Sequence, residues 1–160
     1  MSREHLATYL NDHLAGSVTA LEILDRLAEE ASDLQPFVTG LKRDIEADQQ
    51  VLVDLMAKLG ITQSRFRKAG GWLAERIVEA KLEVDDQSGG LLRRLERLEA
   101  VALGIDGKLA LWRSLFAASS TDVRLQGPGY GDLIERARQQ RENVEALRVE
   151  AARAALRWAA

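Results

Sequence analysis

The sequence predicts an all-α protein, a four-helix bundle formed by residues 1–160 as a single domain. Three observations support this fold class. Apolar residues recur at three- and four-residue steps through most of the chain, which is the period of an amphipathic helix. The chain has only two prolines, Pro36 and Pro128, and is rich in the helix formers Ala, Leu, Glu and Arg. A length of 160 residues is sufficient for one hydrophobic core.

The first two helices are expected at residues 3–32 and 36–59. Pro36 suits the first turn of the second helix, because the N–H that proline lacks has no partner there. Gly60 is the expected stop signal of this helix. The predicted apolar face of the first helix consists of Leu6, Leu10, Leu14, Val18, Leu21, Leu24, Leu27 and Ala31. That of the second consists of Phe37, Leu41, Ile45, Leu52, Leu55 and Leu59.

The second half of the chain predicts two further long helices. A connection at 61–90 contains a shorter amphipathic segment at 72–84, entered through Gly70-Gly71. The third helix is expected at 91–116, and the fourth occupies the remainder after a Gly- and Pro-containing linker at 119–131. The apolar face of the third helix is expected at Leu95, Leu98, Ala102, Ile105, Leu109, Trp112 and Phe116. The fourth uses Leu133, Ala137, Val144, Leu147, Ala151 and Trp158.

The lengths of the connections predict how the helices are ordered. A long crossover between the second and third helices is required if these two run parallel while each half of the chain forms an antiparallel hairpin. This order resembles the ferritin-like superfamily. We therefore expect two antiparallel hairpins joined by a long crossover that carries a short extra helix. An up-down-up-down bundle is the alternative, although it has no need of some 30 residues in this connection.

Four stretches carry a more specific resemblance. They are YLNDHLAG at 9–16, DIEAD at 44–48, AGGW at 69–72 and GKLALW at 107–112. Over nearly the whole chain the pattern resembles a family of uncharacterised bacterial ferritin-like proteins. The resemblance implies the four-helix fold and no established activity.

The metal ligands of ferritin-like proteins have only partial counterparts here. Such proteins place one Glu on each of two helices and Glu-x-x-His on each of the other two. The nearest matches are Glu22, Glu46, Glu99 and Glu142, and both motif histidines are missing. At about 100° per residue, three of these glutamates lie far from the apolar faces of their helices and Glu99 lies at an edge. The sequence therefore predicts neither a metal site nor a cofactor.

A different set of polar residues is expected to point inward or to flank the inward faces. Asp48 lies between Ile45 and Leu52 near the middle of an apolar face, so it needs a donor. The favoured interpretation is a buried polar pair that fixes helix register; the alternative is a relic or modified ligand site. The candidate cluster consists of His13, Asp48, Glu99, Gln140 and Arg141, with Ser17, Asp106 and Arg148 nearby. The candidate donors to Asp48 are His13, Gln140, Arg141 and Arg148.

Glycines inside the predicted helices are interpreted as points of close helix packing. They are Gly16, Gly40, Gly104 and Gly107. The stretch GIDGK at 104–108 has glycines but lacks the spacing of a phosphate-binding loop and lies within a helical pattern. The chain contains no Gly-x-Ser-x-Gly or His-Glu-x-x-His motif, so no catalytic residue is predicted.

Composition restricts the expected environment and partners. Cysteine is absent, which excludes disulfides and thiolate metal sites. The net charge of −3, from 22 basic and 25 acidic residues, does not favour nucleic acid as a partner. No segment has the apolar length of a signal peptide core or a membrane span. We therefore expect a cytoplasmic protein, with membrane binding disfavoured.

The leading functional interpretation is a non-catalytic ferritin-like bundle that acts through protein contacts as a homodimer. One alternative is a ferritin-like di-metal carboxylate protein, either an oxidoreductase or a metal-storage protein. Another is an adaptor or peripheral-membrane protein acting through residues 65–84, where RFRK at 65–68 precedes an apolar edge that includes Trp72 and Ile77. That edge is more simply interpreted as docking on the bundle.

Overall fold

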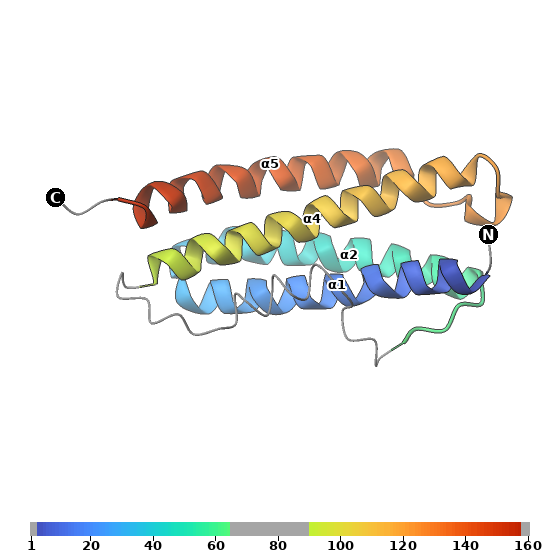
Figure 1. Cartoon of the computed structure of the whole chain (residues 1–160), viewed down its shortest axis with the longest axis horizontal. Helices are drawn as coiled ribbons and strands as arrows, with labels where there is room; N and C mark the ends of the chain where they lie inside the picture. Colours follow the sequence, from blue (N-terminus) through green and yellow to red (C-terminus); the bar gives the residue numbers. More distant parts are fainter. Residues whose placement is uncertain (1–2, 65–89, 158–160) are drawn as a thin grey trace.

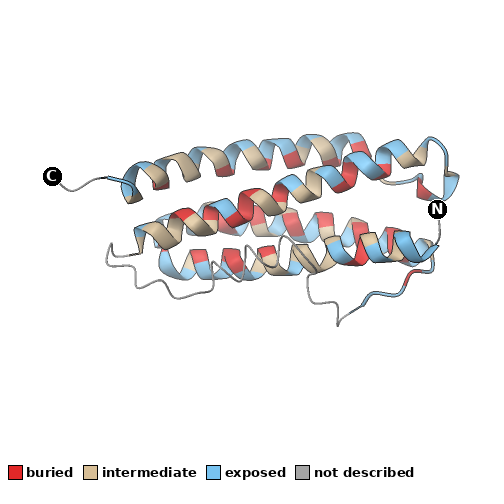
Figure 2. Cartoon of the chain, viewed as in Figure 1, coloured by how far each residue is buried: buried red, intermediate tan, exposed pale blue. Residues whose placement is uncertain are grey.

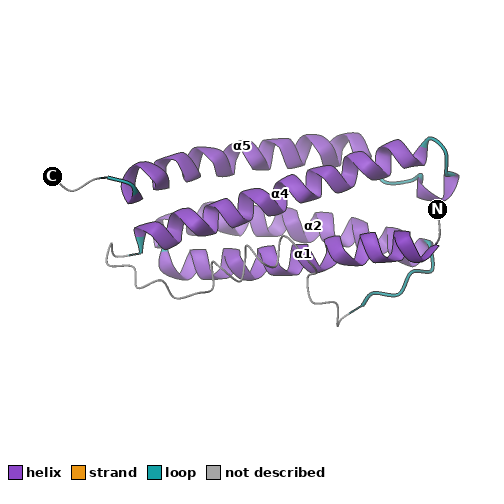
Figure 3. Ribbon diagram, viewed as in Figure 1, coloured by secondary structure: helices purple, strands orange, loops and turns teal. Residues whose placement is uncertain are grey.

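The computed structural model describes residues 3–64 and 90–157, and over these residues it is all-helical with no strand (Figure 3). Four long helices lie side by side with their axes nearly aligned, so the fold is a four-helix bundle (Figure 1). They are α1 (Arg3–Glu30), α2 (Gln35–Lys58), α4 (Leu91–Ser119) and α5 (Tyr130–Ala155). Two short 3-10 helices, η1 (Ser32–Leu34) and η2 (Val123–Leu125), form the turns within the hairpins. The short helix predicted at 72–84, with its apolar edge, lies outside the described residues.

Contacts between the helices give their directions. The end of α1 contacts the start of α4, where Arg97 donates to the carbonyl oxygen of Arg26 at 3.3 Å. The start of α1 contacts the residues that follow α2, because Asn11 donates to the carbonyl oxygen of Thr62. Hence α1 runs antiparallel to both α2 and α4, and α2 and α4 run parallel. With α5 returning along α4, the described chain forms two antiparallel hairpins, as Figure 1 shows.

The helix ends follow the local sequence closely. Pro36 lies in the first turn of α2, where its missing N–H costs nothing. Gly60 ends this helix with φ of +64°, a left-handed conformation that favours glycine. At the other hairpin, α4 extends three residues beyond the predicted end at 116, and α5 begins at Tyr130 within the predicted linker. The sequence thus predicted the first hairpin more accurately than the second.

The core divides into two apolar clusters along the bundle axis, and buried residues face the neighbouring helices throughout (Figure 2). One cluster joins the end of α1 and the start of α2 to the start of α4 and the end of α5. The other joins the opposite ends and includes Leu10, Leu55 and Trp112. Polar side chains occupy the part of the bundle between them.

The predicted apolar face of α4 is wrong near its C-terminal end. Phe116 is 57% exposed, whereas Leu111 and Leu115 are buried. The turn after α4 explains this difference, because it places Leu125 and Tyr130 in the same apolar cluster as those two leucines. The prediction for Val18 on α1 is also wrong, since this side chain is 47% exposed.

Candidate functional site

Four polar residues meet at the middle of the bundle and are referred to below as the central polar cluster: Asp48, Lys108, Arg136 and Gln140. The side chain of Asp48 is 2% exposed. Lys108 Nζ donates to Asp48 Oδ2 at 2.6 Å and also to Gln140 Oε1. Arg136 Nη2 forms an ion pair with Asp48 Oδ1 at 2.5 Å. The cluster therefore joins α2, α4 and α5 through two cations and one anion.

Helical phase explains how each helix brings its residue to this point. Lys108 follows Ile105 by three residues and precedes Trp112 by four, and both of these side chains are buried. Arg136 stands in the same relation to Leu133 and Gln140 on α5, which are also buried. Residues three and four apart share one helix face, so both cations lie on the buried faces of their helices.

The structure confirms the burial of Asp48 but corrects its partners. The predicted donors were His13, Gln140, Arg141 and Arg148, whereas the observed partners are Lys108 and Arg136. Gln140 belongs to the cluster as an acceptor from Lys108. Long basic side chains explain the error, because their apolar stems cover the core while their charged ends reach a buried acceptor.

Burial affects the charge of the cluster. It lowers the pKa of Lys108, because an ammonium ion loses hydration inside the bundle. The neighbouring carboxylate of Asp48 acts in the opposite direction and favours the protonated form. A buried ammonium held by few acceptors gains from any further negative charge placed beside it.

Glu99 and Arg141, also expected in the cluster, lie elsewhere on the surface. Arg141 pairs with Asp106 at 3.1 Å and with Glu145 at 2.9 Å. Arg148 connects Glu99, at 3.5 Å, to the same Glu145. Hydrogen bonds from Arg148 and Arg141 lower the pKa of Glu145 to about 2. These residues form an ion-pair network along α4 and α5, separate from the central polar cluster.

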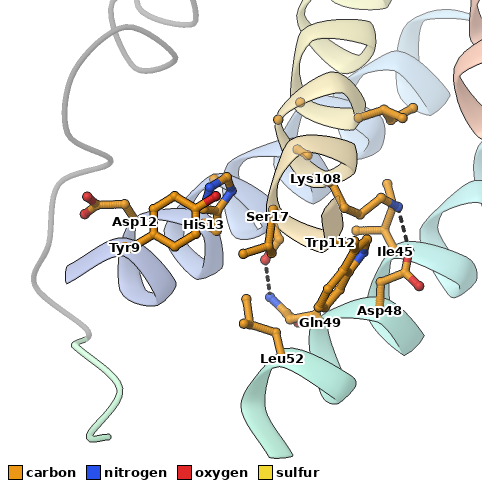
Figure 4. Close-up of a pocket in the computed structure, with 16 residues that line it drawn as sticks. Tyr9, Asp12, His13, Ser17, Ile45, Asp48, Gln49, Leu52, Lys108 and Trp112 are labelled. Atoms are coloured by element: carbon orange, nitrogen blue, oxygen red, sulfur yellow. Dashed lines mark hydrogen bonds and ion pairs between the residues drawn. The ribbon is translucent and has the colours of Figure 1, made fainter. Parts of the chain in front are cut away.

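A cavity of about 290 Å³ lies beside the central polar cluster, between α1, α2 and α4. Much of its wall is apolar, with Ile45, Leu52, Ile105 and Leu111 among the lining residues. Figure 4 shows Tyr9, Asp12 and His13 on α1 at one side, and Lys108, Trp112 and Asp48 at the other. Between them Gln49 Nε2 donates to Ser17 Oγ at 2.9 Å.

His13 lines this cavity without joining the central polar cluster. Its ring lies edge-on to Tyr9, with centroids 4.7 Å apart. Burial lowers the pKa of His13 below its ordinary value of 6.5, although the charge of Asp12 opposes that change. A lowered pKa favours the neutral imidazole near neutral pH. The structure therefore separates His13 from Asp48, with which it was a candidate pair.

Trp112 contributes a polar atom whose role the sequence did not predict. The residue is 1% exposed and lines the cavity. Within the described part of the chain, its indole Nε1 has no hydrogen-bond partner. Buried N–H groups are paired in the great majority of cases, so this donor requires an explanation.

The residues present do not fit a di-metal centre. Glu22, Glu46, Glu99 and Glu142 are all exposed. Across residues 3–64 and 90–157, no three His, Asp or Glu side chains come together as a possible metal site. The middle of the bundle holds the Lys108 ammonium, which repels a metal cation.

Asn11 is a further buried polar residue, and its structural role was not predicted. Its side chain is engaged by the segment that leaves α2: Oδ1 accepts from the Ser64 N–H at 2.7 Å, and Nδ2 donates to the Thr62 carbonyl at 3.2 Å. A further bond runs from Nδ2 to the Ala7 carbonyl. Its position one residue after the buried Leu10 was a signal that sequence reasoning could have used.

Comparisons of the chain with models of known families, with curated proteins and with solved structures find no match. The ferritin-like resemblance therefore stays a prediction. None of the described helices has the length and apolar character needed to cross a membrane. The segment at 65–84, on which the adaptor or peripheral-membrane alternative depends, lies outside the described residues.

Proposed function

We propose that this protein is a non-catalytic bundle of the ferritin-like arrangement, in which an internal ion pair takes the place of a metal. The position of Lys108 is the main observation that supports this proposal. Its ammonium lies midway along the bundle and donates to Asp48 and Gln140. A cation of the protein itself therefore binds these buried acceptors, in place of a metal ion. The parallel course of α2 and α4 supports the ferritin-like arrangement, because it needs a long crossover.

Metal analysis tests this proposal. Protein expressed in medium supplemented with iron and manganese, then desalted, should contain no stoichiometric iron, manganese or zinc by mass spectrometry. The physical reason is that the motif-matching glutamates are exposed and do not converge. About two metal ions per chain, lost on Glu99→Ala substitution, would overturn the proposal in favour of a di-metal protein.

We further propose that the protein acts through contacts with other proteins and forms a homodimer. Phe116 and Val123, which are 57% and 72% exposed, support this role. Both lie at the end of the bundle where α4 leads into η2. Large exposed apolar side chains at one end of a bundle are found at association surfaces.

Sedimentation equilibrium tests the dimer. Wild-type protein should sediment as a dimer, and the double variant Phe116→Glu, Val123→Glu should sediment as a monomer because it places charge on the contact. Leu156→Glu is the control, since this side chain is 69% exposed but lies at the opposite end of the bundle. A monomeric wild type, or a double variant that stays dimeric, would contradict the proposed contact.

A further inference from the structure

The cavity beside the central polar cluster exists partly because a side chain is missing. Gly107 lines it, and among the described residues a Cβ at this position would meet no atom within 4 Å. The prediction of close helix packing is therefore wrong at Gly107, and for the same reason at Gly40; at Gly104, in contrast, a Cβ would contact Ala20 at 3.8 Å. Glycine inside a helix is less favourable than alanine. The chain thus keeps an unfavourable residue next to open space.

The cavity wall contains a buried hydrogen-bond donor that is not used. Within the described residues Trp112 Nε1, which belongs to this wall, has no partner. Arg136 Nε and Gln140 Nε2 also lack partners there, but they belong to the neighbouring central polar cluster and do not line the cavity. Lys108 Nζ carries three protons, of which Asp48 and Gln140 accept two. On the acceptor side, Asp48 Oδ1 has no hydrogen bond within the described residues, but it forms an ion pair with Arg136 Nη2 at 2.5 Å. Trp112 Nε1 and the third proton of Lys108 Nζ are therefore the donors that a further acceptor would satisfy.

The charges nearest the cavity are the Lys108 ammonium and the Asp48 carboxylate, which are both buried. Arg136 is 39% exposed and Asp12 is exposed, so water screens both of these charges. Burial lowers the pKa of Lys108, although the negative charges of Asp48 and Asp44 favour its protonated form. An anion beside Lys108 would offset its loss of hydration.

We propose that this cavity binds a small carboxylic acid with an apolar body. Its carboxylate accepts from Trp112 Nε1 beside Lys108, and its body contacts Ile45, Leu52 and Ile105. Figure 4 shows Trp112 beside Lys108 and Ile45, and all three side chains line the cavity. The volume of about 290 Å³ lies at the lower end of the range for ligand sites, which suits a small molecule. A single negative charge matches the cluster better than a doubly charged phosphate, whose burial is more costly.

Calorimetric titration with three probes of equal chain length tests the head group. Octanoate should bind the full-length protein with one site per chain. 1-Octanol should bind at least about tenfold more weakly, because it lacks the charge-assisted hydrogen bond, and octylamine should not bind. Equal affinities for octanoate and 1-octanol, or no measurable octanoate binding, would overturn the proposal.

Two substitutions test the location. Gly107→Leu should abolish octanoate binding by filling the cavity, without loss of helicity or of stability in urea. Gly40→Leu is the matched control, since Gly40 is also helical and does not line the cavity, and a Cβ there would meet open space within the described part of the chain. Trp112→Phe keeps an aromatic six-membered ring but removes the indole N–H, and should weaken binding about tenfold. Wild-type affinity in either Gly107→Leu or Trp112→Phe would place the ligand elsewhere and overturn the proposal.

Discussion

Asp48 is the one carboxylate of the central polar cluster, so its removal should be costly. Asp48→Ala leaves the Lys108 ammonium, whose side chain is 13% exposed, without its counter-ion. We expect a loss of roughly 2 to 4 kcal/mol in the free energy of unfolding. Most of this comes from Lys108, because Arg136 is 39% exposed and regains water. Urea titration measures the loss.

Glu46→Ala provides the matched control for Asp48→Ala. It removes an exposed carboxylate two residues away on the same helix and should cost less than about 0.5 kcal/mol. Equal and small losses in the two variants would show that α2 does not present Asp48 to the core.

His13 should make stability depend on pH near neutrality. Its pKa is lowered by burial, so the unfolded chain takes up the proton first as the pH falls below 6.5. The unfolded state then binds more protons than the folded state, and the free energy of unfolding decreases until the pH reaches the folded pKa. Urea titrations at about pH 7.5 and about pH 5.5 should show this decrease, and His13→Gln should make it smaller.

An NMR titration of the imidazole gives an independent measurement. The midpoint for His13 in the folded protein should lie below 6.5. A midpoint at or above that value, or an undiminished fall of stability in His13→Gln, would contradict the effect of burial.

Sequence reasoning identified the buried acid but not its partners. The burial of Asp48 could be predicted because Asp48 lies within the apolar stripe of α2. A residue at such a position cannot face solvent unless the whole helix is rotated. Lys108 and Arg136 were not expected in the cluster because Lys and Arg side chains are mostly exposed. Their spacing from Ile105 and Leu133 contained the necessary signal. Residue spacing does not determine which long side chain reaches a given acceptor. That contact depends on the rotation and the axial position of each helix relative to its neighbours.

Asn11 connects two elements, and its amide should stabilise the exit from α2. Asn11→Ala removes one acceptor and one donor for residues 62–64. We expect a loss of about 1 to 3 kcal/mol, because the partners are part-buried, together with faster hydrogen exchange at the Ser64 amide. Asn143→Ala is the control, as Asn143 is exposed and accepts from Gln139 on its own helix. Unchanged exchange at Ser64 in Asn11→Ala would show that this connection does not hold the segment.

The helices differ in how well their buried faces could be predicted. On α2 the predicted and observed faces share Leu41, Ile45, Leu52 and Leu55, because this helix has a distinct polar side. On α4 the buried residues include adjacent pairs such as Leu111 and Trp112, since it contacts α1 on one side and α5 and η2 on others. A helix with several neighbours has no single apolar stripe, and periodicity then misplaces residues such as Phe116.

The whole bundle alternates between apolar and polar packing along its axis. Two apolar clusters lie toward the ends, and the central polar cluster lies between them. Burial of charge at this position does not by itself favour stability, because desolvation opposes the attraction between the ions. Its physical advantage is specificity: Asp48 on α2 pairs with Lys108 on α4 and Arg136 on α5 in a single register. An apolar middle would allow neighbouring registers with similar packing.

Replacing all four residues of the central polar cluster separates its effect on stability from its effect on helix register. The quadruple variant Asp48→Leu, Lys108→Met, Arg136→Met, Gln140→Leu removes all four polar groups together, so no charge is left without a partner. We expect a free energy of unfolding equal to wild type or higher by about 1 to 4 kcal/mol. The amide NMR spectrum should nevertheless show broadened or duplicated signals, because helices without the polar contacts populate more than one register. A single sharp set of signals, with wild-type dispersion, would show that the apolar clusters alone define the register. A large loss of stability would show instead that the ion pairs hold the bundle together, since removing both charges of a pair cannot strand either one.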